Sequence, residues 1–183
     1  RKSDLAIIQA KFVGKSISRS NPSLSIEYLY KDTKGDIDLT TPLSKLPEIG
    51  VFTSDLRESL IENDADIAVH SWKDLPIKLE KGTSVVGTLP RADMRDVLLV
   101  KKNKIDSIKK NKLIKISSSS PRRSYNISAF LNKAVPFDLN EISFKDIRGN
   151  IPTRLNKFIS DESDGIVLAK AALDRILENS DKD

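Results

Sequence analysis

The segment LIKISSSSPRRSYNISAFL, residues 113–131, joins a short apolar run to a longer amphipathic one through four serines. The run LIKIS is rich in β-branched residues, which favours a strand. A helix is expected to follow through Tyr125, Ile127 and Leu131. Pro121 suits the first turn of that helix, where no amide proton is needed, and Ser120 can cap it. The segment therefore predicts a strand, a turn and a helix in succession, which is the repeating unit of α/β proteins.

The same alternation continues on both sides of this segment. Further strands are expected at 24–30, 65–71, 96–100, 142–146 and 164–169. Further helices are expected at 4–19, 53–63, 104–112 and 149–159 and through residues 172–177. The polar stretch from Lys31 to Thr41, which includes Gly35, is expected to be a loop. We predict an α/β fold with two small domains, 1–90 and 95–183, which contain mostly parallel sheets and have a cleft between them.

Composition excludes several classes of protein. No apolar run approaches the ~20 residues of a membrane-spanning helix, and the start RKSDLAII does not resemble a secretory signal. The absence of cysteine excludes disulfides, and with one histidine a transition-metal site lacks support. No Walker loop or GxGxxG pattern indicates a nucleotide cofactor. We expect a cytoplasmic monomer that has no metal, membrane or nucleic-acid partner.

Charge points to an anionic ligand. The net charge is +5, and the positive excess lies in residues 95–183. Ligands of α/β folds bind beyond the carboxyl ends of the strands, and arginine and serine residues recur at those positions in this chain. The serine-rich turn is surrounded by Ser119, Ser120, Arg122 and Arg123. Arg148 precedes the helix at 149–159, and Arg154 lies within it. Arg1 and Ser3 stand before the first helix, and Arg175 lies on the last. The alternative is a capped helix with solvated arginines and surface charge that serves solubility.

Lys73 and Asp74 follow the expected strand 65–71. They are either functional groups at a strand end or a surface ion pair worth about 0–1 kcal/mol. His70 is expected to be a structural residue, since the crowding of His70, Ser71 and Asp74 does not favour a catalytic triad.

Several of these residues fall in motifs that resemble one family. ADIAVHSWKDLP (65–76) is similar to the AD-x-AVHS-x-KD-x-P signature of the porphobilinogen deaminases. RKSDLAIIQA at the start, TKGD (33–36), SSSSPRR (117–123), IRGNIPTRL (147–155) and GIVLAKAALDRI (165–176) match further motifs of that family in order. The resemblance covers nearly the whole chain. It departs at IGVFTSDL (49–56), where Ile49 and Asp55 replace a lysine and a glutamate, so only Phe52 carries over there.

The resemblance implies an enzyme that condenses four porphobilinogen molecules head to tail with loss of ammonia, in haem biosynthesis. It implies that Asp74 is the catalytic carboxylate. It also implies that the carboxylates of a dipyrromethane cofactor are bound by Ser71, Lys73, Ser119, Ser120, Arg122 and Arg123. It implies that the substrate or the growing chain is bound by Arg1, Ser3, Arg148, Arg154 and Arg175.

The cysteine that carries the cofactor in this family belongs to a third domain, and this chain has no cysteine. We therefore expect a fragment of a longer protein that is inactive alone. Two alternatives remain, a non-catalytic two-domain protein that binds an anionic solute and a nucleic-acid-binding module. The second is weakened by an aromatic content of only 5%.

Overall fold

The computed structural model describes residues 1–33, 53–78 and 80–180. These residues form two compact units, Arg1–Arg91 and Ala92–Asp183. Most of the expected polar loop, including Gly35, lies outside the described residues. The same holds for Ile49 and Phe52 of the segment 49–56, where the chain departs from the family motif. Among the described helices, none combines the length and apolar character needed to cross a bilayer.

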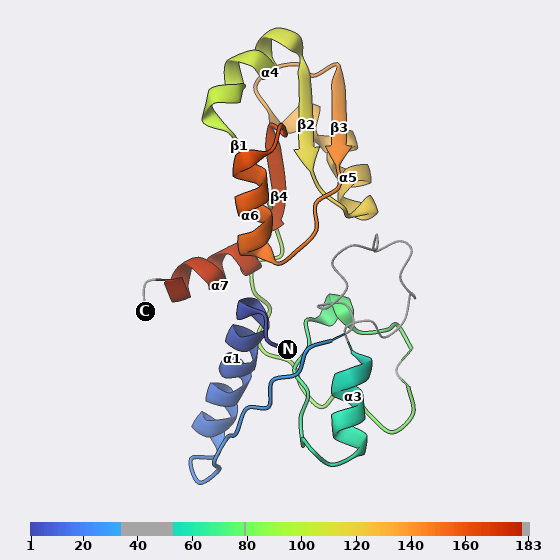
Figure 1. The fold of residues 1–183 in the computed structure, drawn as a ribbon, viewed down its shortest axis with the longest axis vertical. Helices are drawn as coiled ribbons and strands as arrows, with labels where there is room; N and C mark the ends of the chain where they lie inside the picture. Colours follow the sequence, from blue (N-terminus) through green and yellow to red (C-terminus); the bar gives the residue numbers. More distant parts are fainter. Residues whose placement is uncertain (34–52, 79, 181–183) are drawn as a thin grey trace. The chain divides into compact units, whose positions relative to one another are not determined.

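A four-stranded sheet in the order β1-β4-β2-β3 organises the second unit (Figure 1). The strands are β1 Asp96–Val100, β2 Leu113–Ser117, β3 Glu141–Lys145 and β4 Gly165–Ala169. β2 pairs in parallel with both β3 and β4, whereas β1 runs antiparallel to β4. The sheet is therefore mostly parallel, and the α/β class predicted from the sequence is confirmed.

Helices follow the strands as the sequence predicts. They are α4 Ile105–Asn111 (preceded by the short 3-10 helix η3 Lys102–Lys104), α5 Pro121–Ala134, α6 Ile151–Ser160 and α7 Lys170–Ser180. α5 begins at Pro121 with Ser120 as its N-cap, as expected. α4 ends at Asn111, and its C-cap residue Lys112 has a left-handed backbone (φ 56°) that turns the chain directly into β2.

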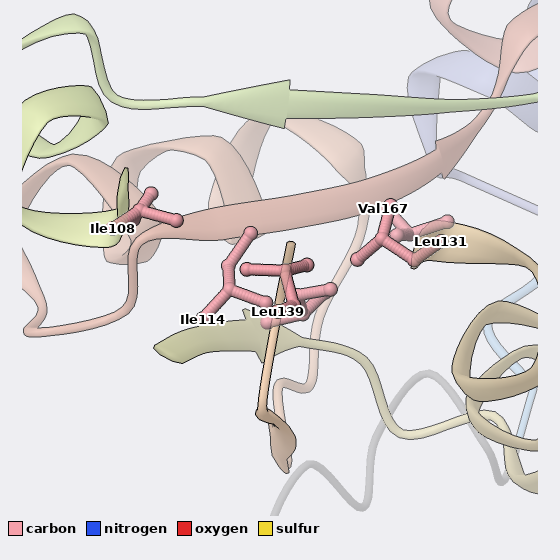
Figure 2. Packing of buried hydrophobic residues seen from close by; sticks show 6 residues of the cluster. Ile108, Ile114, Leu131, Leu139 and Val167 are labelled. Carbon is pink, nitrogen blue, oxygen red and sulfur yellow. The ribbon is translucent and has the colours of Figure 1, made fainter. Parts of the chain in front are cut away.

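Strand β4 is buried on both faces of the sheet. On one face, the core consists of side chains from the sheet, from α4 and α5 and from the loop before β3: Ile108, Ile114, Ile116, Leu131, Leu139 and Val167. Figure 2 shows side chains of this cluster gathered beside the strands. Because alternate residues of a strand face opposite sides, Ile166 and Leu168 of β4 point to the other face, where α6 contacts β4.

Two buried serines of this unit are linked to a carboxylate by hydrogen bonds. Ser117 and Ser163 are fully buried, and the hydroxyl of Ser117 donates to that of Ser163, which in turn donates to Asp161 at 3.0 Å. Lys101 and Lys145 also lie 3.6 and 3.5 Å from Asp161. Burial opposes ionisation of this carboxyl, but the two hydrogen bonds from Ser163 and the two lysines hold its pKa below the usual value. Asp161 is therefore ionised at neutral pH.

Among its described residues, the first unit contains the helices α1 Asp4–Ser20 and α3 Ser54–Ile61 and the short 3-10 helix η2 Trp72–Asp74. The helices expected at 4–19 and 53–63 are thus confirmed. Gly14, which is buried on α1, lets the chain pass close by, because a Cβ at this position would overlap the ring of Tyr28. The Tyr28 and Tyr30 rings stack with their centroids 6.3 Å apart.

The strands expected at 24–30 and 65–71 are wrong, since no strand is present among the described residues of this unit. Their apolar and β-branched residues suggested burial in a sheet, but Leu24, Leu29 and Ile67 are about half exposed, at 53%, 54% and 49%. A strand requires a neighbour that completes its hydrogen-bond ladder, and propensity alone does not supply one. The segment 24–30 packs against α1 through Tyr28 instead.

Gly165 tests the pairing of β4 with β1. A Cβ at Gly165 would lie 3.0 Å from Cδ1 of Leu98 and 3.2 Å from the carbonyl oxygen of Leu99, which is part of the ladder and cannot move freely. We expect Gly165→Ala to lower the free energy of unfolding by about 1–3 kcal/mol. Denaturant unfolding followed by circular dichroism measures the change.

Gly87→Ala is the matched control, because a Cβ there meets nothing within 4 Å. Its effect should stay within about 0.5 kcal/mol. Equal effects of the two substitutions would contradict the close approach of β1 and β4 at Gly165.

Candidate functional site

One edge of the sheet in the second unit collects the carboxyl ends of β2, β3 and β4, because these strands run in the same direction. Ser117 is paired with Lys145, and the amide of Ser118 donates to the carbonyl of Lys145 at 2.9 Å. The first residue of β1, Asp96, reaches the same edge through its antiparallel pairing with Ala169. The serine turn, the loop before α6 and the start of α7 therefore lie at this edge.

The N-terminus of α5 presents a serine and two arginines. The hydroxyl of Ser120 accepts a hydrogen bond from the amide of Arg123 at 3.4 Å, as an N-cap does. The Arg123 guanidinium forms a two-point ion pair with Asp96, with Nε–Oδ2 and Nη2–Oδ1 distances of 3.1 and 2.9 Å. Arg122 is exposed. Arg123 is thus held in a fixed orientation, and its Nη1 lies outside this pair.

Asp96 was not singled out from the sequence, because only the antiparallel placement of β1 brings it to this edge. Regular alternation of strands and helices gives no signal for a reversed edge strand.

The N-terminus of α6 is built on Gly149 and Asn150. Gly149 has a φ of 116°, which an L side chain rarely adopts. The side chain of Asn150 caps the helix by accepting from the amide of Thr153 at 2.9 Å. Arg148 precedes this turn, and its carbonyl accepts from Nζ of Lys157 at 3.1 Å. Asn150 is a cap that its position before Ile151 and Pro152 could have revealed.

Arg154 lies on the first turn of α6 and is largely buried. Burial and, second, the positive charge of Arg123 lower the pKa of its guanidinium. Its buried Nε has no hydrogen-bond partner among the described residues. Two arginines from the starts of two helices therefore come close enough to repel each other.

Two other predicted site residues of this unit, Arg175 and Ser119, do not lie at a helix N-terminus. Arg175 is half-buried in the second turn of α7. The hydroxyl of Ser119 donates to the carbonyl of Ile147 at 2.8 Å and accepts from its amide at 2.7 Å. Ser119 therefore binds the loop before α6.

A pocket of about 280 Å³ lies beside β3 and α6. It is lined by Lys145, Asp146, Ile147, Arg148, Lys157, Ser160 and Asp161. Of the residues predicted from the sequence, this pocket includes Arg148 alone, so it does not coincide with the arginines of α5.

In the first unit, Asp74 lies between two cations. Its Oδ2 is 3.7 Å from Nη1 of Arg1, and its Oδ1 is 3.1 Å from Nζ of Lys73. The side chain of Asp74 is 16% exposed, whereas that of Lys73 is 81% exposed. Asp74 and Arg1 thus form the inner pair of this site, and Lys73 approaches from solvent.

The turn that carries Asp74 is attached to α1. The amide of Asp74 donates to the carbonyl of Ser71 at 2.9 Å, which closes the 3-10 turn. The hydroxyl of Ser71 donates to Oε1 of Gln9 on α1 at 3.0 Å. Ser3 is the N-cap residue of the same helix, although its hydroxyl makes no capping hydrogen bond. Gln9 falls in the quoted N-terminal motif, but the sequence gives no signal for its hydrogen bond with Ser71, which only the structure shows.

His70 reports on the charges of this site. Its burial lowers its pKa below the usual 6.5; Asp74 opposes this effect, and Arg1 reinforces it. The imidazole is therefore neutral at pH 7.

The only histidine of the chain allows a direct pH titration of the site by NMR. The imidazole resonances should titrate with a midpoint below 6.5 in the wild-type protein. In Asp74→Asn the midpoint should fall further, because the charge that favours the imidazolium is lost. Because the folded-state pKa is lowered, stability contributed by His70 should be complete above pH 6.5 and decline as the pH falls.

Asp66→Asn, at an exposed carboxylate of the preceding segment, is the control and should leave the midpoint unchanged. A midpoint that rises in Asp74→Asn would show that Asp74 does not face His70.

Comparison with known proteins gives one family. Residues 1–182 match the family described as "Porphobilinogen deaminase, dipyromethane cofactor binding domain". The chain is 38% identical over 176 residues to porphobilinogen deaminase of Chlorobium phaeovibrioides and 37% identical over 177 residues to that of Chlorobium phaeobacteroides. Each alignment covers 96% of this chain and 53% of the relative, so the chain spans about half the length of these relatives. The chain belongs to the porphobilinogen deaminase family.

Proposed function

We propose that the chain forms the cofactor-binding and substrate-binding part of a hydroxymethylbilane synthase, which condenses four porphobilinogen molecules head to tail with loss of ammonia. The family match supports this reaction and does not favour the non-catalytic solute-binding alternative. The protein would act on a small molecule, as a cytoplasmic monomer.

The observation that carries the proposal is the surroundings of Arg154. Its guanidinium is largely buried beside a second arginine, and its Nε has no hydrogen-bond partner among the described residues, so it has lost hydration without full compensation. An anion bound at this point would supply the missing hydrogen bonds and relieve the repulsion. Porphobilinogen carries acetate and propionate groups, and each added unit brings two more carboxylates. A ligand of this kind matches the charge of the site.

The residues at the start of α5 fit the carboxylates of a dipyrromethane group. The hydroxyl proton of Ser120 and the backbone amide of Arg122 offer donors, and the Arg122 side chain is exposed and available. Arg123 is oriented by Asp96 and retains Nη1 for a ligand. When bound, the dipyrromethane would supply the terminal pyrrole to which the first unit is joined, and each later unit would be joined to the one before it. We propose that Arg148, Arg154 and Arg175 bind the carboxylates of the substrate or growing chain.

In the first unit we propose Asp74 as the catalytic carboxylate. Loss of ammonia from porphobilinogen leaves an electron-poor pyrrole, and formation of the new bond passes through cationic character. A carboxylate can accept a hydrogen bond from the pyrrole N–H and stabilise this charge. It can also help to move a proton.

The contacts of Asp74 support this role. Nη1 of Arg1 lies 3.7 Å from Oδ2 of Asp74 and fixes the carboxylate in place. The side chain of Asp74 is still 16% exposed, so the carboxylate is accessible. Lys73 is so exposed that its pair with Oδ1 is easily exchanged, and its ammonium can turn to a ligand carboxylate. We propose that Lys73, Ser71, Arg1 and Ser3 contribute binding groups around it.

Replacement of Asp74 by Asn tests the proposal. Asn keeps the shape of the side chain but removes the charge, so turnover of porphobilinogen by the intact protein should fall by at least ~100-fold. Formation of hydroxymethylbilane followed by absorbance, with kcat and KM measured separately, gives the result.

Asp66→Asn again serves as the control and should keep wild-type turnover. Near-normal kcat in Asp74→Asn would refute the catalytic role of Asp74, and absence of turnover in the wild-type protein would refute the proposed activity.

A further inference from the structure

The hydroxyl of Ser119 makes both of its protein hydrogen bonds to a single residue in another loop. It donates to the carbonyl of Ile147 at 2.8 Å and accepts from the amide of Ile147 at 2.7 Å. A serine hydroxyl has one proton, so its capacity as a donor is used completely. Ser119 therefore has no proton left to donate to a ligand carboxylate in this arrangement.

These two bonds take the place of missing rungs in the parallel ladder. The last backbone bond between β2 and β3 runs from the amide of Ser118 to the carbonyl of Lys145. If the ladder continued, the amide of Ile147 would bond the carbonyl of Ser118, and the carbonyl of Ile147 would accept from the amide of Ser120. The chain turns into α5 at this point, and the Ser119 hydroxyl satisfies both backbone groups of Ile147 instead.

The linked residues stand directly beside the proposed anion-binding groups. Ser119 precedes Ser120, the N-cap of α5, and Ile147 precedes Arg148. Ile147 is 8% exposed, so its amide and carbonyl depend on this hydroxyl for a partner. Movement of either loop would change the separation between the α5 N-terminus and Arg148.

We infer that Ser119 is a positioning residue that sets the spacing of the two anion-binding loops through Ile147, and that it does not bind the ligand itself. This inference rests on the proposed function of the site. A polyanion that touches both loops would then bind in a geometry that the Ser119–Ile147 link determines. Loss of the link should weaken binding, although every arginine is still present.

The test compares Ser119→Ala, Ser119→Thr and Ser124→Ala in the intact protein. Ser124 is the matched control, because its hydroxyl donates to the carbonyl of Ser120 within α5 and joins no second loop. Gly165→Ala is a second control that lowers stability in the same sheet without touching either loop. The readouts are amide exchange of Ile147 without ligand, and kcat and KM for porphobilinogen.

In Ser119→Ala, exchange at Ile147 should become at least ~10-fold faster, because this amide loses its acceptor. KM should rise by about 10-fold, with a smaller change in kcat, because binding geometry is disturbed and the catalytic carboxylate is not. Ser119→Thr keeps the hydroxyl and should restore both values. Ser124→Ala and Gly165→Ala should leave KM unchanged.

Two results would overturn the inference. A raised KM with unchanged exchange at Ile147 would show that Ser119 contacts the ligand directly. Faster exchange with unchanged KM would show that the link does not serve binding. If the wild-type protein fails to turn over porphobilinogen, the proposed function fails and the role of Ser119 in binding fails with it, while exchange at Ile147 still reports whether the two loops are joined.

Discussion

The parallel pairing of β2 with β3 and β4 is the constraint on which the second unit depends. Parallel strands must place their carboxyl ends at one edge, and the helices that follow must begin there. β4 is buried on both faces and β2 buries Ile114 and Ile116 in the core, which fixes their register and with it the position of each loop. The turn rich in serine and arginine can contribute to an anion-binding site only in this arrangement, because the parallel strands bring the starts of α5 and α6 together.

Charge is distributed differently in the two units. In the second, cations gather at the sheet edge with partial compensation, since Asp96 pairs with Arg123, while the buried Nε of Arg154 has no partner in the part of the chain that the structure describes. In the first, a nearly buried carboxylate, Asp74, is flanked by Arg1 and Lys73. The arrangement in the second unit suits binding of an anion, and the arrangement in the first unit suits stabilisation of positive charge during a reaction.

Sequence patterns predicted the second unit well because its elements have strong periodicity and clear caps. Ser120, Pro121 and the apolar run of β4 are local signals, and local signals decide strands and helices. The first unit was predicted less well, because 24–30 and 65–71 have strand-like composition but no partner strand among the described residues, and pairing is a property of distant segments. For the same reason the Asp96–Arg123 pair and the Ser119–Ile147 link, each joining residues more than 25 positions apart, had no signature in the sequence. The cleft expected between the two domains stays a prediction.

The proposed function requires that the protein recognises the carboxylates of its ligand. The most direct measurement is calorimetric binding of porphobilinogen and of its diester, in which both carboxylates are blocked and the ammonium is kept, to the Asp74→Asn variant of the intact protein, in which turnover is suppressed. The account predicts that the dicarboxylate binds and that the diester binds at least ~10-fold more weakly, because the diester cannot satisfy the buried arginine. Equal affinity for the two ligands would contradict it.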